Sequence, residues 1–181
     1  MKLDFTYASK LDHIQDIEER NQAFDQLTEE EQRKEIAWDV IKLVEAKTIT
    51  ASHGCYWGGD LHEINTQVQN RIITTSKEVQ KQVLKVQKCS VCARGAAMLS
   101  QIRLSNNVCD NDVSCGNDEN VKGFTMSAMH DMENEFEHSS HYLPYDENSD
   151  EKLINIFLNV IHNGDFDTSD DTDYLAQFLI S

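Results

Sequence analysis

The sequence contains few residues that break regular structure. It has one proline, Pro144, and seven glycines among 181 residues. Because these residues punctuate turn-rich β architectures, their scarcity favours helices. The chain also lacks an apolar run of about 18 residues, which excludes a membrane-spanning helix. Its first twenty residues hold no apolar core and no small-residue cleavage site, so we expect no secretion signal.

Basic residues are also scarce. Sixteen Lys and Arg stand against thirty-two Asp and Glu, for a formal net charge of −16. The imbalance is largest in residues 131–181, where thirteen acids face one base, Lys152, and leave a net charge of −12. Such a field repels phosphate backbones and anionic lipid, so we expect neither direct nucleic-acid binding nor membrane binding. It would attract a protein with a basic surface. The alternative is that the charge serves only to keep the protein soluble.

Five cysteines form an odd set with no export signal, so we expect free thiols in a reducing cytoplasm. Cys89 and Cys92 stand three residues apart, and three interpretations of that pair are open. Packing inside a small-residue helix is favoured, because Cys, Ala and Gly are small and often buried. A zinc site would need Cys55, Cys89, Cys92 and a histidine. Redox exchange is disfavoured, because residues 78–88 resemble a helix and not the buried strand that precedes such a motif.

Hydrophobic periodicity predicts five helices. The clearest begins at Thr28, with Glu31 placed to complete a capping box. The other four are expected to begin near Ser76, after Ser90, near Thr125 and at Ser149. The last of these should end at the Asn163-Gly164 pair.

The remaining segments predict little further regular structure. Residues 47–57 and 70–76 are rich in β-branched side chains, which allows one small β-hairpin or two short strands. Residues 105–122 are polar and turn-rich, so we expect an exposed loop there. The sequence thus predicts a mainly α fold: one acidic globular domain over residues 1–181, with about five helices.

No catalytic motif is present, so we expect no enzymatic activity and assign no catalytic residue. The chain has no phosphate-binding glycine loop, no nucleophile elbow and no zinc-protease helix. Cys55 lies beside His53, but adjacency in sequence does not establish a nucleophile and its base. Tyr56 and Trp57, followed by two glycines, predict an aromatic loop. Exposed, the two rings would form a recognition site or line a small-ligand pocket. Buried, they would instead anchor the core, which is the interpretation that we favour.

Two segments, "KCSVCARGAAMLSQIRL" (88–104) and "DEKLINIFLNVIHNGDFD" (150–167), resemble a group of small uncharacterised proteins from bacteria and their phages. That group shares a Cys-x-x-Cys-Ala-x-Gly-Ala helix and a later helix that ends in Asn-Gly. The resemblance implies an accessory protein of a phage or mobile element, working in the cytoplasm of a bacterial host. It supplies no activity and no catalytic residue.

The leading hypothesis is a non-enzymatic, phage-encoded accessory protein that binds another protein. Its acidic surface would occupy the basic surface of a nucleic-acid-dependent or defence protein of the host and inhibit it. The candidate contact residues are Glu133, Glu135, Glu137, Asp146, Glu147, Asp167, Asp170 and Asp171.

Two alternatives stay open. The first is a small-ligand or nucleotide-binding protein with a pocket near Tyr56 and Trp57. The second is a zinc-stabilised structural module that uses Cys55, Cys89 and Cys92; otherwise no cofactor is expected. Amphipathic helices often associate, so a homodimer is a further expectation.

Overall fold

The computed structural model describes residues 7–54, 58–105, 121–138 and 149–163. In these residues the chain is mainly helical, as predicted, with seven helices where about five were expected. The elements are α1 (Ile17–Asp25), α2 (Glu29–Glu45), β1 (Ile49–Ala51), α3 (Asp60–Gln69), α4 (Ser76–Val83), β2 (Cys89–Val91), α5 (Ala93–Leu104), α6 (Met126–His138) and α7 (Ser149–Asn163). None of these helices is long and apolar enough to cross a membrane.

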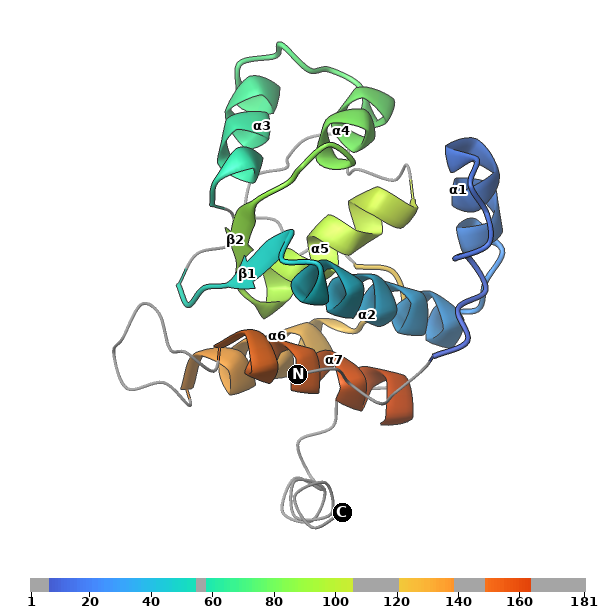
Figure 1. Cartoon of the computed structure of the whole chain (residues 1–181), viewed down its shortest axis with the longest axis vertical. Helices are drawn as coiled ribbons and strands as arrows, with labels where there is room; N and C mark the ends of the chain where they lie inside the picture. The colour runs from blue at the N-terminus through green and yellow to red at the C-terminus, as the bar shows by residue number, and fades with distance from the viewer. Residues whose placement is uncertain (1–6, 55–57, 106–120, 139–148, 164–181) are drawn as a thin grey trace.

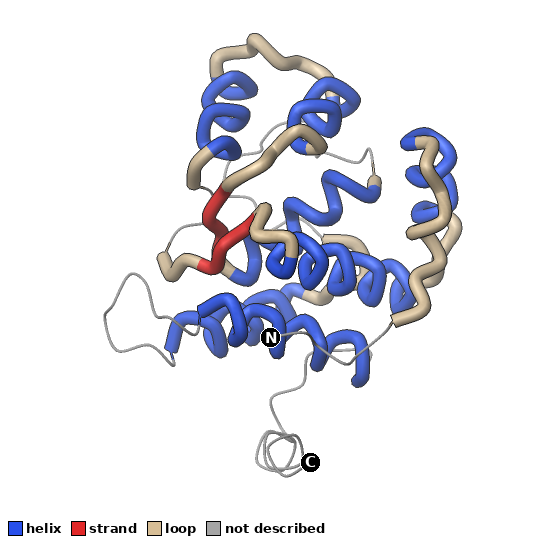
Figure 2. Tube along the Cα trace, viewed as in Figure 1, coloured by secondary structure: helices blue, strands red, loops and turns tan. Residues whose placement is uncertain are grey.

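The elements are arranged in layers along the longest axis of the molecule (Figure 1). α2 and α5 lie in the middle with the two short strands beside them. α6 and α7 cover one side of this middle layer, and α3 and α4 lie toward the opposite end (Figure 2). α2 makes its most extensive contacts with α7 and then with α5, so it is the helix around which the core is built.

The position of α2 follows from its sequence. Thr28 caps the helix and Glu31 completes the predicted capping box, so the first turn is satisfied within the helix. The predicted apolar stripe is buried, and its members are all 1% exposed or less: Ile36, Ala37, Val40, Ile41 and Val44. Three residues of α7 that are 0% exposed complete this core: Leu153, Phe157 and Val160.

The predicted β-hairpin is wrong, because β1 and β2 pair in parallel with Ile49 opposite Cys89. A hairpin joins antiparallel strands, whereas parallel strands need a long crossover, here formed by α3 and α4. Residues 70–76 are not a strand: 70–75 form the connection between these helices, in which Arg71 has a left-handed φ of 57°, and Ser76 begins α4. The β-branched run there has one deeply buried member, Ile73.

The helix predicted after Ser90 begins later than expected. Residues 89–91 form β2, Cys92 is the N-cap, and α5 starts at Ala93. The small residues of α5 then pack in the core: Ala93, Ala96 and Ala97 are 0% exposed. The prediction placed the Cys-x-x-Cys pair on one helix, but it spans the end of a strand and the start of a helix.

Residues 7–14 form an N-terminal strap that lies against α2. Glu35 of α2 is only 2% exposed, and its carboxylate accepts hydrogen bonds from Ser9 Oγ (2.6 Å) and from the backbone amide of Lys10 (2.7 Å). Burial raises the pKa of Glu35, although these two bonds oppose the shift. Leu11, at 2% exposed, anchors the strap in the core.

Replacing Ser9 with alanine should destabilise the protein by about 2 kcal/mol, because a buried carboxylate then loses a donor. Ser9 Oγ also accepts from the backbone amides of Leu11 and Asp12, which adds to the loss. Urea unfolding measures the change. Ser127→Ala, an exposed site on α6, is the matched control. Equal stability of the two variants would contradict this role of the strap.

Candidate functional site

Titratable and potentially nucleophilic side chains lie together where the parallel strands end. Because β1 and β2 run in the same direction, their carboxyl ends meet at one edge, where ligands bind in many parallel sheets. The loop after β1, the first turn of α5, the second half of α6 and the first turn of α7 meet there. We call the following residues the carboxyl-edge cluster: His53, Cys92, Arg94, Glu133, Glu137, Ser149 and Asp150.

His53 is the centre of this cluster. Its ring stacks on Phe136, with centroids 4.4 Å apart and planes 14° from parallel. Its Nε2 lies 3.2 Å from Ser149 Oγ, and its Nδ1 lies 3.7 Å from a carboxylate oxygen of Glu137. The backbone amide of Gly54 donates to both oxygens of that carboxylate, at 2.9 and 3.1 Å. The loop after β1 is therefore joined to both α6 and α7.

The order serine, histidine, carboxylate matches the arrangement that activates a nucleophilic serine. Two features oppose that chemistry here. Ser149 is 2% exposed, and the 3.7 Å between His53 and Glu137 exceeds a hydrogen bond. Glu137 instead receives its hydrogen bonds from the backbone of Gly54. We therefore interpret the three side chains as a structural junction between segments distant in sequence.

The first turn of α7 continues the junction. Asp150 accepts a hydrogen bond from the backbone amide of Ala51, the last residue of β1 (2.7 Å), and pairs with Lys47 Nζ, just before β1 (3.0 Å). Lys152 donates to the backbone carbonyl of Phe136 (2.9 Å), which fixes α7 against α6. α7 thus holds the carboxyl end of β1 and the second half of α6 together.

Cys89 and Cys92 are 3% and 2% exposed, as the packing interpretation expected. Burial raises the pKa of each thiol to about 12. The argument against redox exchange was wrong in one respect, because a strand does precede the helix. The raised pKa values now oppose redox chemistry, which needs a stabilised thiolate.

One cysteine of the proposed zinc site cannot be compared with the structure. Among the described residues, no group of three His, Cys, Asp or Glu side chains could hold a metal ion. Cys55, the third cysteine of the proposed set, lies outside the described residues. The residues present therefore supply only the buried pair, Cys89 and Cys92.

The predicted contact residues have three different outcomes. Glu133 and Glu137 make internal contacts, Glu133 through an ion pair with Arg94 at 3.6 Å. Glu135 is exposed on α6. The remaining predicted residues lie outside the described part of the chain: Tyr56, Trp57, Asp146, Glu147, Asp167, Asp170 and Asp171.

The described residues on either side of 55–57 are held to β2. The backbone amide of Ser52 donates to the carbonyl of Val91 (2.8 Å), and that of Gly58 donates to the carbonyl of Ser90 (2.9 Å).

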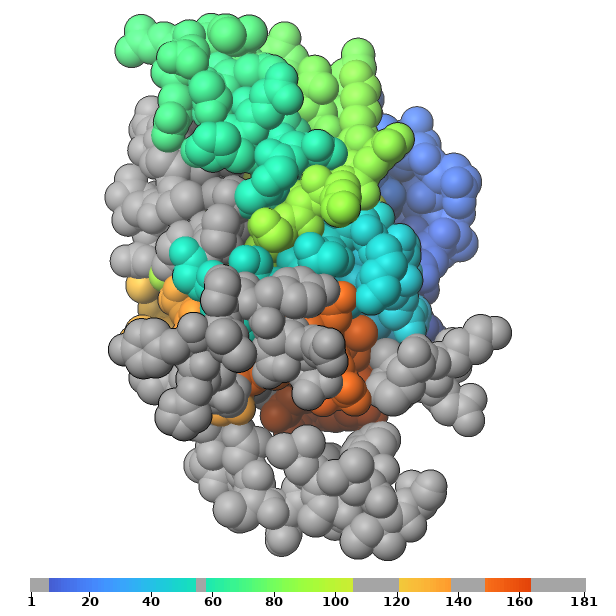
Figure 3. Space-filling view, turned by 60° about the vertical axis from the view of Figure 1, so that its left-hand side comes forward, coloured from blue at the N-terminus to red at the C-terminus, as the bar shows by residue number. Residues whose placement is uncertain are grey.

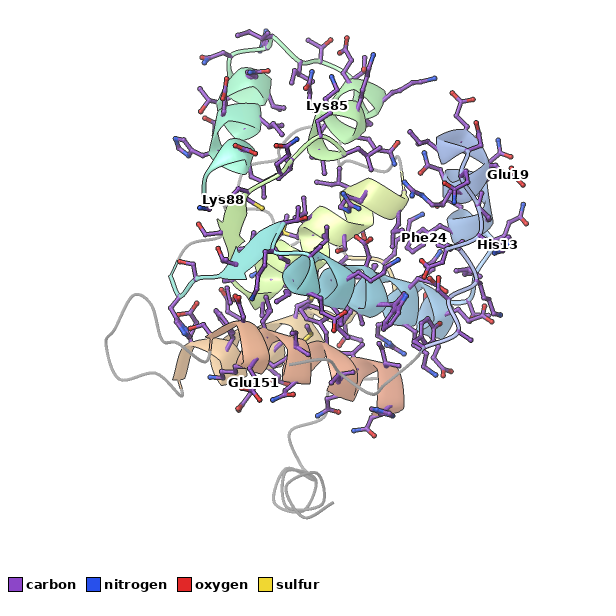
Figure 4. All side chains as sticks on the ribbon, in the orientation of Figure 1. His13, Glu19, Phe24, Lys85, Lys88 and Glu151 are labelled. Atoms are coloured by element: carbon purple, nitrogen blue, oxygen red, sulfur yellow. The ribbon has the colours of Figure 1, made fainter. Side chains whose placement is uncertain are left out.

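Sequence reasoning missed a second acidic surface, on α1 and the first turn of α2. Residues 1–35 hold ten acids and five bases, but the prediction gave weight only to the C-terminal part. We call the following exposed residues the N-terminal acidic surface: Asp16, Glu18, Glu19, Asp25, Glu29 and Glu30. Ile17, 43% exposed, lies among them, and Figure 4 labels Glu19 on α1.

Comparisons with protein-family models, with curated proteins and with solved structures each found no match. The resemblance to bacterial and phage accessory proteins therefore depends on residues 88–104 and 150–167 alone. It stays a prediction.

The two buried thiols should resist alkylation in the folded protein. With a pKa of about 12, each would be about one part in ten thousand thiolate at pH 8, and burial blocks access as well. Peptide mapping after iodoacetamide treatment should find Cys89 and Cys92 modified only after urea is added. Rapid modification of either thiol without urea would show that its burial is not maintained in solution.

Replacing His53 with alanine should cost about 2 kcal/mol, from the lost ring stacking and the lost contact with Ser149. His62→Ala, at an exposed position on α3, should cost little and is the matched control. Thermal unfolding compares the two variants. A fluorophosphonate probe should leave Ser149 unlabelled. If the probe labels Ser149 and His53→Ala abolishes that labelling, Ser149 is an activated nucleophile and the structural role is wrong.

Proposed function

We propose that this protein acts by binding, without catalysis, to a protein that carries a basic surface. In this proposal the chain is an accessory protein that inhibits a nucleic-acid-dependent or defence protein of a bacterial host. The observation that carries the proposal is the net charge of −16, much of it on exposed side chains. A basic surface that holds nucleic acid is complementary to such a field.

The N-terminal acidic surface supports this proposal. Six exposed carboxylates lie on or next to α1 and on the first turn of α2, and α1 also carries the exposed Ile17. Interfaces combine an apolar contact with a polar rim, and charge at the rim raises the association rate. Glu19 and Glu29 have no ion-pair partner among the described residues, so both are available to an incoming cation.

The α6–α7 layer offers a smaller surface than the sequence suggested. Glu135 and Glu151 are exposed there, whereas Glu133 and Glu137 maintain the junction. The C-terminal candidates Asp167, Asp170 and Asp171 remain part of the proposal on their sequence alone.

A second candidate function is binding of a small ligand or nucleotide. One observation favours it: Ser52 and Gly58, the described neighbours of the segment that contains Tyr56 and Trp57, are both bound to β2 of a parallel strand pair, and such pairs often bind ligands at their carboxyl edge. A thermal shift with one member of a metabolite panel would support it, and a flat response would remove it. The third candidate, a zinc-stabilised module, predicts that a chelator lowers Tm.

Association with the basic partner should depend on salt and on specific carboxylates. Native capture from bacterial lysate identifies the partner, and titration with that purified protein measures Kd at ~0.1 M and ~0.5 M salt, a range over which charge contacts weaken. The double variant Glu19→Gln/Glu29→Gln should weaken binding at least about fivefold. Glu45→Gln/Glu63→Gln changes the net charge equally at other exposed sites and is the control. Salt-insensitive binding would contradict the proposal.

A further inference from the structure

One region of this acidic chain has the opposite charge. Residues 58–91 contain five bases and three acids, a net charge of +2 on a protein of net charge −16. This stretch includes α3, α4 and the segment that leads into β2; we call it the crossover lobe. It lies toward one end of the longest axis, away from α6 and α7 (Figures 1 and 3).

The acids of the crossover lobe are used locally. Asp60 accepts from the backbone amides of Gln87 (3.2 Å) and Lys88 (3.3 Å), and so holds the segment before β2 to the start of α3. Glu78 accepts from Thr75 Oγ1 (3.1 Å) at the start of α4. These carboxylates stabilise the lobe itself.

Most cations of the lobe have no such role. Lys77 pairs with Glu18 of α1 at 2.5 Å. The other four are exposed, and no carboxylate of the described residues lies within ion-pair distance of them: Arg71, Lys81, Lys85 and Lys88. Figure 4 labels Lys85 and Lys88 on the segment that runs from α4 to β2. The lobe therefore presents four unpaired positive charges to solvent.

The lobe also carries the most exposed large apolar side chain of the described residues. Ile72 is 70% exposed, in the turn between α3 and α4 and directly after Arg71. Exposed charge alone would be ordinary solvation. An isolated isoleucine beside unpaired cations instead fits a partner that combines acidic and apolar residues.

The chain itself contains such a partner. Residues 164–181 carry five aspartates and no base, and five large apolar residues follow the last aspartate: Tyr174, Leu175, Phe178, Leu179 and Ile180. The aspartates are Asp165, Asp167, Asp170, Asp171 and Asp173, all within ten residues of the end of α7. Charge and hydropathy in this segment thus complement the crossover lobe.

We propose that residues 164–181 of one copy bind the crossover lobe of a second copy. α7, which ends at Asn163, belongs to the layer farthest from the lobe of its own chain (Figure 1). A second copy can instead bring its lobe to the segment that follows α7. Reciprocal exchange of the two segments closes a twofold dimer, in which each copy donates and receives one.

The overall charge of −16 does not prevent this contact. At physiological salt, charges more than about 8 Å apart are largely screened, so the opposite charges in contact dominate. The inference is independent of the proposed function, because it concerns the pure protein. It adds a form of regulation, since Asp167, Asp170 and Asp171 are also candidate contacts for a basic partner, which would compete with the lobe.

Sedimentation of the full-length protein tests the proposal. Over about a hundredfold range of concentration, the wild-type chain should shift reversibly from monomer to dimer, and less so at higher salt. Lys81→Gln/Lys85→Gln should weaken dimerisation at least about fivefold. Lys10→Gln/Lys34→Gln removes the same charge from exposed and half-buried positions outside the lobe and is the control.

A charge exchange makes the test specific. Lys81→Glu/Lys85→Glu and Asp170→Lys/Asp171→Lys should each lose self-association, and an equimolar mixture should recover dimers, because altered lobe and altered segment are complementary again. A monomer at every concentration would overturn the proposal, as would unchanged dimerisation of the lobe variants. Binding of a labelled oligonucleotide by a monomeric protein would assign the lobe to nucleic acid instead.

Discussion

The burial of α2 on two sides is the constraint on which the rest of the structure depends. A helix with one apolar stripe can rest on a single neighbour, but here Leu43 and Asp39 are buried beside the main stripe. α2 must therefore lie between α5 and α7, its two principal contacts. Arg103 of α5 satisfies Asp39 at 2.9 Å, so the enclosed carboxylate costs less than an unpaired one would.

A buried amide pair between α1 and α4 fixes the position of the crossover lobe. Asn21 of α1 and Gln80 of α4 exchange two hydrogen bonds, at 3.0 and 2.8 Å, and both side chains are buried. Gln80 also donates to the backbone carbonyl of Arg103 at the end of α5 (3.2 Å). A buried amide pair is satisfied only when both partners are present, so it fixes α1 and α4 at the end of the central layer. The lobe is held at its base while its outer turn stays exposed.

The sequence predicted those elements that local chemistry determines. The capping box of α2 is complete within four residues, and the stripe of α7 repeats through four turns, so the start of α2 and the end of α7 were predicted correctly. α1 was missed because only Asn21 and Phe24 are buried in it, too few for a periodic pattern. The parallel pairing of β1 with β2 was missed because strands of three residues show almost no alternation and pair across forty positions. The contact of His53 with Ser149 joins residues 96 positions apart, and no local pattern encodes it.

Because α7 covers one side of α2, the core can close only after α7 has been synthesised. During synthesis the chain leaves the ribosome from its N-terminus, so α2 emerges long before residues 149–163. Until α7 arrives, the side of α2 that α7 covers has no lasting partner, and β1 lacks the carboxylate that closes its end. A nascent chain halted before α7 would thus expose a large apolar face of α2, which makes it a natural substrate for chaperones. Of the helices that the structure describes, the last to be made is the one that completes the core.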